Sequence, residues 1–195
     1  MTNLLFPEGD GHTVLSEEDR LGLIPTYIAT RGELNEAEQR NIAGAMLRRR
    51  PSLTRLLDDK YLRDLHKAMF GDVWTWAGHY RSRETNIGIE PSGITVAVRT
   101  LVDDARAWID YRTYEPDEVA IRFHHRLVAI HPFPNGNGRH ARVAADYLIS
   151  RLDRPQFNWG ANSTQDTPSL RAHYRQALRA ADVGEMGVLM AFARS

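Results

Sequence analysis

Apolar residues recur at helical spacing along most of the chain, and this pattern predicts a mainly α-helical fold. Two capping signatures, Ser16 with Asp19 and Thr30 with Glu33, mark the starts of the first two helices. The second of these helices is expected over residues 33–48, and the later helices over residues 59–70, 98–112, 117–130, 138–152 and 168–181. The last of them is followed by a short helix after Gly184.

One stretch, residues 79–97, departs from this helical pattern. Its residues that favour strands are Thr85, Ile87, Ile89, Ile94, Thr95 and Val96, and Pro91-Ser92-Gly93 can turn the chain between them. The stretch therefore predicts a single β-hairpin. No linker or repeat divides the chain, so we expect one globular unit in which an N-terminal arm and helices (residues 1–54) pack on a larger part (residues 55–195).

Composition narrows the classes of function that remain. The chain of 195 residues has 25 basic and 25 acidic residues and a net charge of zero, which argues against broad electrostatic binding of nucleic acid. It has no cysteine, which excludes disulfide scaffolds, thiolate metal sites and thiol catalysis. Neither a membrane span nor a secretory leader is recognisable, so we expect a soluble, cytoplasmic protein without membrane or nucleic-acid contacts.

The stretch from His131 to Arg142 carries the candidate chemistry. It reads His-Pro-Phe-Pro-Asn-Gly-Asn-Gly-Arg-His-Ala-Arg. Gly136 and Gly138 can turn successive N–H groups to one side at a helix start, where the helix dipole also favours an anion. Arg139 and Arg142 share one face of the first turn, and two guanidinium groups there suit a polyphosphate.

His131 ends the preceding helix and stands across a short loop from this anion cradle. Histidine is the side chain whose ordinary pKa, about 6.5, best suits general-base catalysis near neutral pH. A base facing a phosphate cradle indicates phosphoryl or nucleotidyl transfer, with His131 activating an attacking hydroxyl group.

These residues resemble the Fic signature, His-Pro-Phe-x-(Asp/Glu)-Gly-Asn-Gly-Arg-x-x-Arg, and only Asn135 departs from it. The segment from Trp76 to Arg81 and the C-terminal region from Tyr174 to Phe192 are also similar to this family, so the resemblance covers about residues 55–195. The stretch from Glu33 to Ile42 resembles a Fic subgroup named mobile mystery protein B, a name that assigns no function.

The resemblance implies a mostly helical enzyme that moves AMP from ATP to a Ser, Thr or Tyr hydroxyl of a target protein. His131 would deprotonate the target hydroxyl, Phe133 would anchor the loop in the core, and Arg139 and Arg142 would bind the β/γ end of ATP. The residues implied to hold the nucleotide phosphates are Gly136, Asn137 and Gly138. The hairpin would be a flap that pairs with the target backbone, and its residues are Thr85, Asn86, Ile87 and Gly88.

Two further expectations concern metal binding and regulation. The family's acidic residue helps to hold Mg²⁺, and Asn135 in its place offers a carbonyl oxygen without the charge, so we expect weaker metal binding. Many relatives carry an inhibitory helix whose glutamate pairs with the second arginine of the signature. Glu33 and Glu38 are the candidates for this role, and one of them is expected to pair with Arg142.

Other functions compete with AMP transfer. The same site could transfer another phosphate-containing group or remove AMP. A metal hydrolase could use His124 and His131, which are two helical turns apart, although no carboxylate ligand lies near them in sequence and His140 is expected to face solvent. The third hypothesis is a catalytically silent nucleotide-binding module that is paired with a co-encoded DNA-binding partner. The presence of His131 argues against it, since binding alone needs no base.

Overall fold

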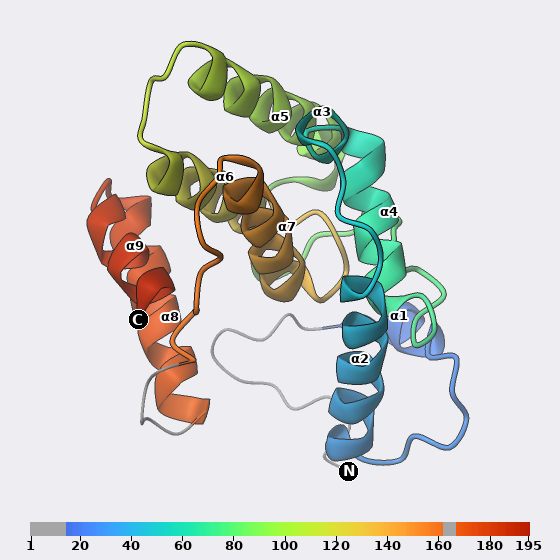
Figure 1. The fold of residues 1–195 in the computed structure, drawn as a ribbon. Helices are drawn as coiled ribbons and strands as arrows, with labels where there is room; N and C mark the ends of the chain where they lie inside the picture. The colour runs from blue at the N-terminus through green and yellow to red at the C-terminus, as the bar shows by residue number, and fades with distance from the viewer. Residues whose placement is uncertain (1–14, 162–166) are drawn as a thin grey trace.

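Helices α6 (Pro116–Ile130) and α7 (Asn137–Arg151) form the centre of the computed structural model, which describes residues 15–161 and 167–195 (Figure 1). Helix α5 (Ile94–Asp110) crosses above them, and α8 (Thr167–Asp182) and α9 (Met186–Arg194) pair on one side. On the opposite side α2 (Arg31–Met46) packs against α4 (Asp59–Phe70). The shorter elements are α1 (Glu17–Leu21), α3 (Leu53–Leu56) and the 3₁₀ turn η1 (Pro91–Gly93). The predicted mainly helical fold is confirmed.

Helix α4 shows why the hydrophobic pattern located the helices well. The carboxylate of Asp58 accepts the N–H of Tyr61 at 3.1 Å and caps its start, and Gly71 follows its last residue. Its buried face is formed by Leu62, Leu65, His66, Met69 and Phe70, at spacings of three and four residues. Each large apolar side chain buried in this way contributes about 1.5–3 kcal/mol, which outweighs the weak propensities of single residues.

The predicted hairpin is wrong, because residues 79–97 pair with no strand in the described parts of the chain. Residues 82–90 form an irregular loop, and α5 begins at Ile94. Of the β-branched residues that suggested a strand, Ile94, Thr95 and Val96 belong to α5, in which Ile94 and Val98 are buried while Val96 is 68% exposed. Burial of this face overrides the modest preference of β-branched residues for strands.

The N-terminal helices pack directly on the segment that follows α4. The indole N–H of Trp76 donates to the carbonyl of Asp19 at 2.9 Å, and Leu23 forms an isolated antiparallel bridge with Trp74. Asn41 of α2 donates to the carbonyl of Ala68 in α4 at 3.1 Å. These contacts fix α2 beside α4, and they place one face of α2 close to the start of α7.

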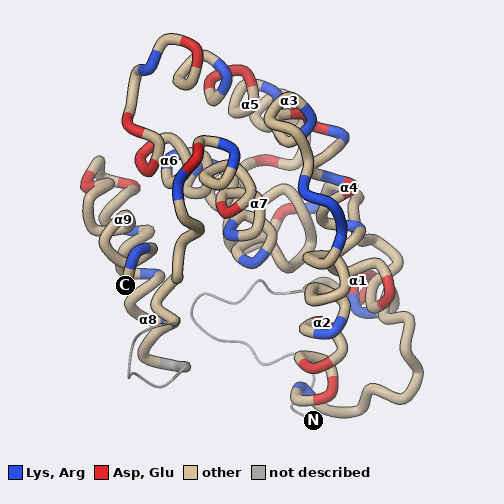
Figure 2. Tube along the Cα trace, viewed as in Figure 1, with Lys and Arg blue, Asp and Glu red and all other residues tan. Residues whose placement is uncertain are grey.

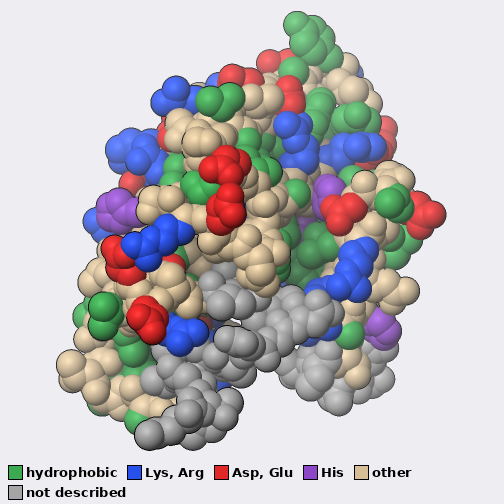
Figure 3. Space-filling model, turned by 180° about the vertical axis from the view of Figure 1, so that it is seen from behind, with side chains coloured by type: hydrophobic (Ala, Val, Ile, Leu, Met, Phe, Trp, Pro, Cys, Tyr) green, Lys and Arg blue, Asp and Glu red, His purple; other side chains and the backbone are tan. Residues whose placement is uncertain are grey.

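Charges of both signs are interspersed over the described helices, and no face of a single sign stands out along the trace or from behind (Figures 2 and 3). None of the described helices is long and apolar enough to cross a bilayer.

Candidate active site

His131 lies at the C-terminal end of α6, where the sequence placed it. Its backbone adopts the left-handed conformation (φ 54°, ψ 59°), which ends the helix and turns the chain into the signature loop. Its N–H still donates to the carbonyl of Leu127 at 3.2 Å. The residue is only 6% exposed, so its imidazole sits in a largely desolvated position.

This burial controls the protonation of His131. The pKa of the imidazole is lowered to about 4, mainly by loss of hydration and in smaller part by the nearby charge of Arg81, while a hydrogen bond to the backbone of Val128 acts in the opposite direction. At neutral pH the ring is therefore neutral and able to accept a proton. Anionic phosphates bound nearby would raise this pKa towards the range in which a general base is most efficient.

The loop after His131 is held rigidly by side chains of its own. The side-chain oxygen Oδ1 of Asn137 accepts the N–H of Phe133 at 2.9 Å, and its Nδ2 donates to the carbonyl of Phe133 at 2.8 Å. Phe133 is fully buried, as expected of an anchor. Gly136 is left-handed (φ 79°), and a Cβ there would lie 2.6 Å from the ring of Phe70. Because the side chain of Asn137 is used within the loop, only its backbone N–H is left to contact phosphates.

His66, which the sequence did not single out, also supports this loop. Its Nδ1 accepts the N–H of Gly78 at 3.0 Å, so Nε2 carries the proton and donates to the carbonyl of Asn135 at 3.0 Å. The ring stacks on Phe133 with the centroids 3.7 Å apart. Complete burial and the neighbouring His140 keep the pKa of His66 well below its ordinary value, and this preserves the neutral form that both hydrogen bonds require.

The first turn of α7 combines unpaired N–H groups with a positively charged side chain. Arg142 is partly exposed and lies over the ring of Tyr174 at 5.2 Å. It makes no ion pair with any residue in the described ranges. The hydroxyl of Tyr174 lies near Gly138, 3.6 Å from where a Cβ would stand. The backbone at Gly138 thus lies close to the side chain of Tyr174, over which the guanidinium of Arg142 is placed.

Arg139, by contrast, already has an acidic partner, Glu38 of α2. The two form an ion pair of 2.7 Å, and the other carboxylate oxygen of Glu38 accepts the indole N–H of Trp74 at 2.8 Å. Glu38 is 1% exposed, so this pair is buried on its acidic side. The expectation that a glutamate pairs with Arg142 is wrong in its partner, since the packing of α2 directs Glu38 to Arg139.

Glu33, the second candidate for an inhibitory residue, is part of the helix cap. Its carboxylate accepts the N–H groups of Ala29 at 2.8 Å and Thr30 at 2.9 Å, and these bonds lower its pKa. The capping box predicted from the sequence is confirmed, and the carboxylate of Glu33 is used in this cap and does not pair with Arg142.

Asn135 is a poor match for a Mg²⁺ ligand in this conformation. Its side-chain oxygen accepts the N–H of Gly136 at 2.6 Å, and its own carbonyl accepts from His66. The position offers no charge, and its one carbonyl-type side-chain oxygen is already engaged. The loop therefore does not fit a protein-held Mg²⁺ ion at this position.

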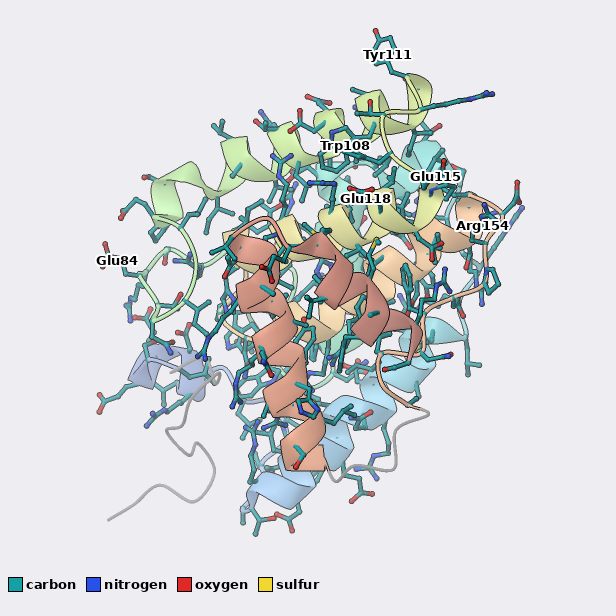
Figure 4. The ribbon with its side chains drawn as sticks, turned by 90° about the vertical axis from the view of Figure 1, so that its left-hand side faces the viewer. Glu84, Trp108, Tyr111, Glu115, Glu118 and Arg154 are labelled. Carbon is teal, nitrogen blue, oxygen red and sulfur yellow. The ribbon has the colours of Figure 1, made fainter. Side chains whose placement is uncertain are left out.

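The expected flap lies against His131, although it is not a hairpin. The hydroxyl of Thr85 donates to the carbonyl of Ile87 at 2.6 Å and closes a tight turn. A Cβ on Gly88, which has φ 109°, would be 2.6 Å from the Cβ of His131. Asn86 is exposed, and Glu84 points outward from the same loop (Figure 4). The structure thus brings one end of the loop to His131 and leaves the other at the surface.

The remaining histidines near the signature have partners other than a metal. His124 is buried and joined to the hydroxyl of Tyr174 by a hydrogen bond of 3.0 Å. His140 is fully buried, which corrects the expectation that it faces solvent, and it donates to the carbonyl of Leu62 at 2.9 Å. Within residues 15–161 and 167–195, no three His, Asp or Glu side chains gather as a metal site would require.

Comparison with known proteins agrees with this geometry. Residues 56–149, which include the whole signature loop, match the model of the Fic/DOC family. The matched residues are therefore similar to a Fic domain. Solved Fic domains share the fold of this chain. One from a Bartonella sp. AR 15-3 effector has a TM-score of 0.69 at 15% identity and covers 91% of both chains. Another from Bartonella quintana, solved with bound ADP, has a TM-score of 0.65 at 18% identity, covering 87% of this chain and 86% of the other.

Among curated proteins, the chain is similar to the protein adenylyltransferase fic-1 of Caenorhabditis elegans. The two are 26% identical over 131 residues, which is 63% of this chain and 24% of the relative. The chain thus spans about a quarter of the length of that relative.

Proposed function

We propose that this protein transfers AMP from ATP to a hydroxyl side chain of a target protein. The observation that carries the proposal is the pairing of a neutral, buried His131 with an adjacent helix N-terminus and an arginine, Arg142, that forms no ion pair with any described residue. A base and an anion site separated by one short loop are what in-line transfer of a phosphorus centre requires. The similarity to protein adenylyltransferases supports AMP as the group transferred.

The proposed step uses the residues of the signature in distinct roles. Backbone N–H groups of Asn137 and Gly138 and the guanidinium of Arg142 hold the phosphates, with the α-phosphorus towards His131, whereas the N–H of Gly136 is bonded to the side chain of Asn135. The imidazole takes the proton of the target hydroxyl, whose oxygen forms a bond to the α-phosphorus. The bond from that phosphorus to the bridging oxygen breaks, and pyrophosphate leaves with the electron pair. Since Asn135 does not fit a metal site, Mg²⁺ would enter with the ATP phosphates, and no step is assigned to it.

The partner we propose is a protein carrying an accessible Ser, Thr or Tyr, docked along the flap residues Thr85 to Gly88. The exposed side of this loop and its approach to His131 support this arrangement. The stretch from Glu33 to Ile42 supports assignment to the mobile mystery protein B subgroup, and with it a co-encoded DNA-binding protein as a candidate partner.

Intact-mass spectrometry tests the proposed function. The purified protein and a cell lysate are incubated with ATP and Mg²⁺, and we expect a gain of one AMP mass on a protein species. A gain of a phosphate mass would assign the site to a different group transfer, and loss of AMP from a modified protein would indicate the reverse reaction. No mass change on any protein would argue for a regulatory nucleotide-binding module.

Replacing Glu38 is expected to activate the enzyme at a cost in stability. In Glu38→Gly, Arg139 becomes available to phosphate, and we expect AMP incorporation to rise about tenfold, because a carboxylate and a phosphate compete for one guanidinium. The loss of a buried partner should also lower the free energy of unfolding by about 3–5 kcal/mol. Labelled-AMP incorporation and thermal unfolding with and without ATP measure the two effects.

Glu33→Gln is the matched control for this experiment, since Glu33 lies on the same helix and only caps it. Glu38→Gln keeps an oxygen for the indole of Trp74 while removing the charge, so it separates the ion pair from the packing. Unchanged incorporation in both Glu38 variants, in protein that is still folded, would show that this pair does not restrain the site.

Asn135→Asp is expected to raise Mg²⁺-dependent activity. The substitution adds a carboxylate, the ligand type that Mg²⁺ favours, at the position where the loop now has none. We expect the Mg²⁺ concentration for half-maximal incorporation to fall by about tenfold, with little change in the fold. Titration of Mg²⁺ at constant ATP measures this shift. A lower rate than the wild type at saturating Mg²⁺ would indicate that Asn135 serves a different substrate.

A further inference from the structure

Arg81 is a buried arginine whose close hydrogen-bond partners are all backbone carbonyls. It is 5% exposed, although arginine is seldom buried without an acidic partner. Its Nε donates to the carbonyl of His131 at 2.7 Å. One terminal nitrogen donates to the carbonyl of Arg83 at 2.8 Å, and the other donates to the carbonyl of Ile89. A single guanidinium thus joins both ends of the loop 83–89 to the backbone of His131.

The backbone completes this attachment. The N–H of Arg81 donates to the carbonyl of Pro132 at 2.9 Å, and the N–H of Ile89 makes a longer contact of 3.4 Å with the carbonyl of Ile130. Gly88 lies so close that a Cβ there would be 2.7 Å from a terminal nitrogen of Arg81 and 2.6 Å from the Cβ of His131. The loop is therefore fitted against the end of α6 at the residue that carries the candidate base.

The charge of Arg81 is only distantly compensated. Burial lowers its pKa, while Glu90 and Glu84 raise it through space. Both carboxylates belong to the exposed side of the same loop and its continuation. Burying a charged group is costly, and a folded chain keeps one where its donors are needed in a fixed geometry. Only arginine offers donors spread widely enough to reach three carbonyls at once.

We propose that Arg81 is a positioning residue that holds the loop 83–89 over His131 and fixes the backbone of His131 in its left-handed conformation. The role in catalysis rests on the proposed AMP transfer, whereas the mechanical attachment does not. Without the guanidinium the loop has few remaining contacts with α6. The loop would then no longer be held over the imidazole of His131, and a target protein would dock on a loop without a fixed conformation.

The experiment compares Arg81→Met and Arg81→Lys with wild type by hydrogen–deuterium exchange, with Arg83→Gln as the matched control. Arg83 lies on the same loop, and its side chain pairs with exposed Glu18. In the Arg81→Met variant we expect hydrogen–deuterium exchange of residues 82–90 and 130–133 to accelerate about tenfold or more. The acceleration should be smaller in Arg81→Lys and slight in the Arg83→Gln control. Exchange elsewhere should be unchanged.

Two exchange results would overturn the proposal: unchanged exchange of residues 82–90 in both Arg81 variants, or equal acceleration throughout the chain, which would make Arg81 a general stabiliser. If the Arg81→Met variant does not fold, the exchange rates of the Arg81→Lys variant decide whether Arg81 holds the loop. Labelled-AMP incorporation is measured in parallel and should fall at least tenfold in Met while Arg83→Gln keeps the wild-type rate. Absence of incorporation in the wild type would refute the proposed transfer, while the exchange result would still decide the attachment.

Discussion

His131→Ala is expected to lower AMP transfer by about 100- to 10,000-fold, the range that a positioned general base contributes. ATP affinity should change little, because the phosphates are held by the start of α7 and Arg142 and not by the imidazole. Incorporation of labelled AMP and calorimetric titration with ATP measure the two quantities. A parallel loss of binding and turnover would instead make His131 a residue that binds phosphate or maintains the loop.

The backbone of His131 makes the choice of control important. A left-handed conformation strains alanine, whereas asparagine and glycine adopt it readily. His131→Asn therefore removes the base without this added strain. If it is as inactive as the alanine variant and binds ATP equally well, the loss of activity belongs to the imidazole and not to a disturbed loop.

The second large effect is a steep loss of stability in mild acid. The pKa values of four buried histidines, His66, His124, His131 and His140, are lowered by burial, and those of His131 and His140 fall to about 4. In the unfolded chain these groups bind protons once the pH falls below about 6.5, whereas in the native state they stay neutral. A lowered native-state pKa of a histidine therefore favours folding at neutral pH, and this stability is lost as the pH falls.

Asp146 acts in the opposite direction. Burial raises its pKa to about 6, so below that pH the native state binds a proton that the unfolded carboxyl does not bind until about 4. In this range the unfolded chain binds four protons, one on each histidine, and the native protein binds one, on Asp146. Unfolding is therefore accompanied by a net uptake of three protons. Between about pH 6 and pH 4 the free energy of unfolding should fall by about 4 kcal/mol per pH unit. A domain of ordinary stability, about 5–15 kcal/mol, would lose most of it over this range.

Urea unfolding followed by circular dichroism at several pH values measures this slope. His124→Gln and His140→Gln should each reduce the slope by about one proton, and His79→Gln, which removes an exposed histidine, is the matched control. A free energy of unfolding that is the same at pH 7 and pH 5 would contradict the assignment of these four residues as buried neutral histidines.

The hydrophobic pattern identified the helices well because helical burial follows a local period. Residues 59–70 were located to the residue, and the expected helix at 117–130 begins one position earlier, at Pro116. The position of His131 at a helix end and the glycine turn before α7 were also readable, since both depend on neighbours in the chain. The hairpin failed for a related reason. Residues 94–96 favour strands by type, and their place in a helix depends on a buried face that extends to Ala105.

The sequence by itself thus determined the helical class, the position of the candidate anion-binding loop and the candidate base. Only the tertiary structure decided which groups complete the site. Glu38 and Arg139 are 101 residues apart, and the packing of α2 on α4 brings Glu38 to Arg139 and not to Arg142. Arg81 likewise reaches His131 across 50 residues. A local period shows that a side chain is buried but not which group it meets, because that depends on how distant helices pack.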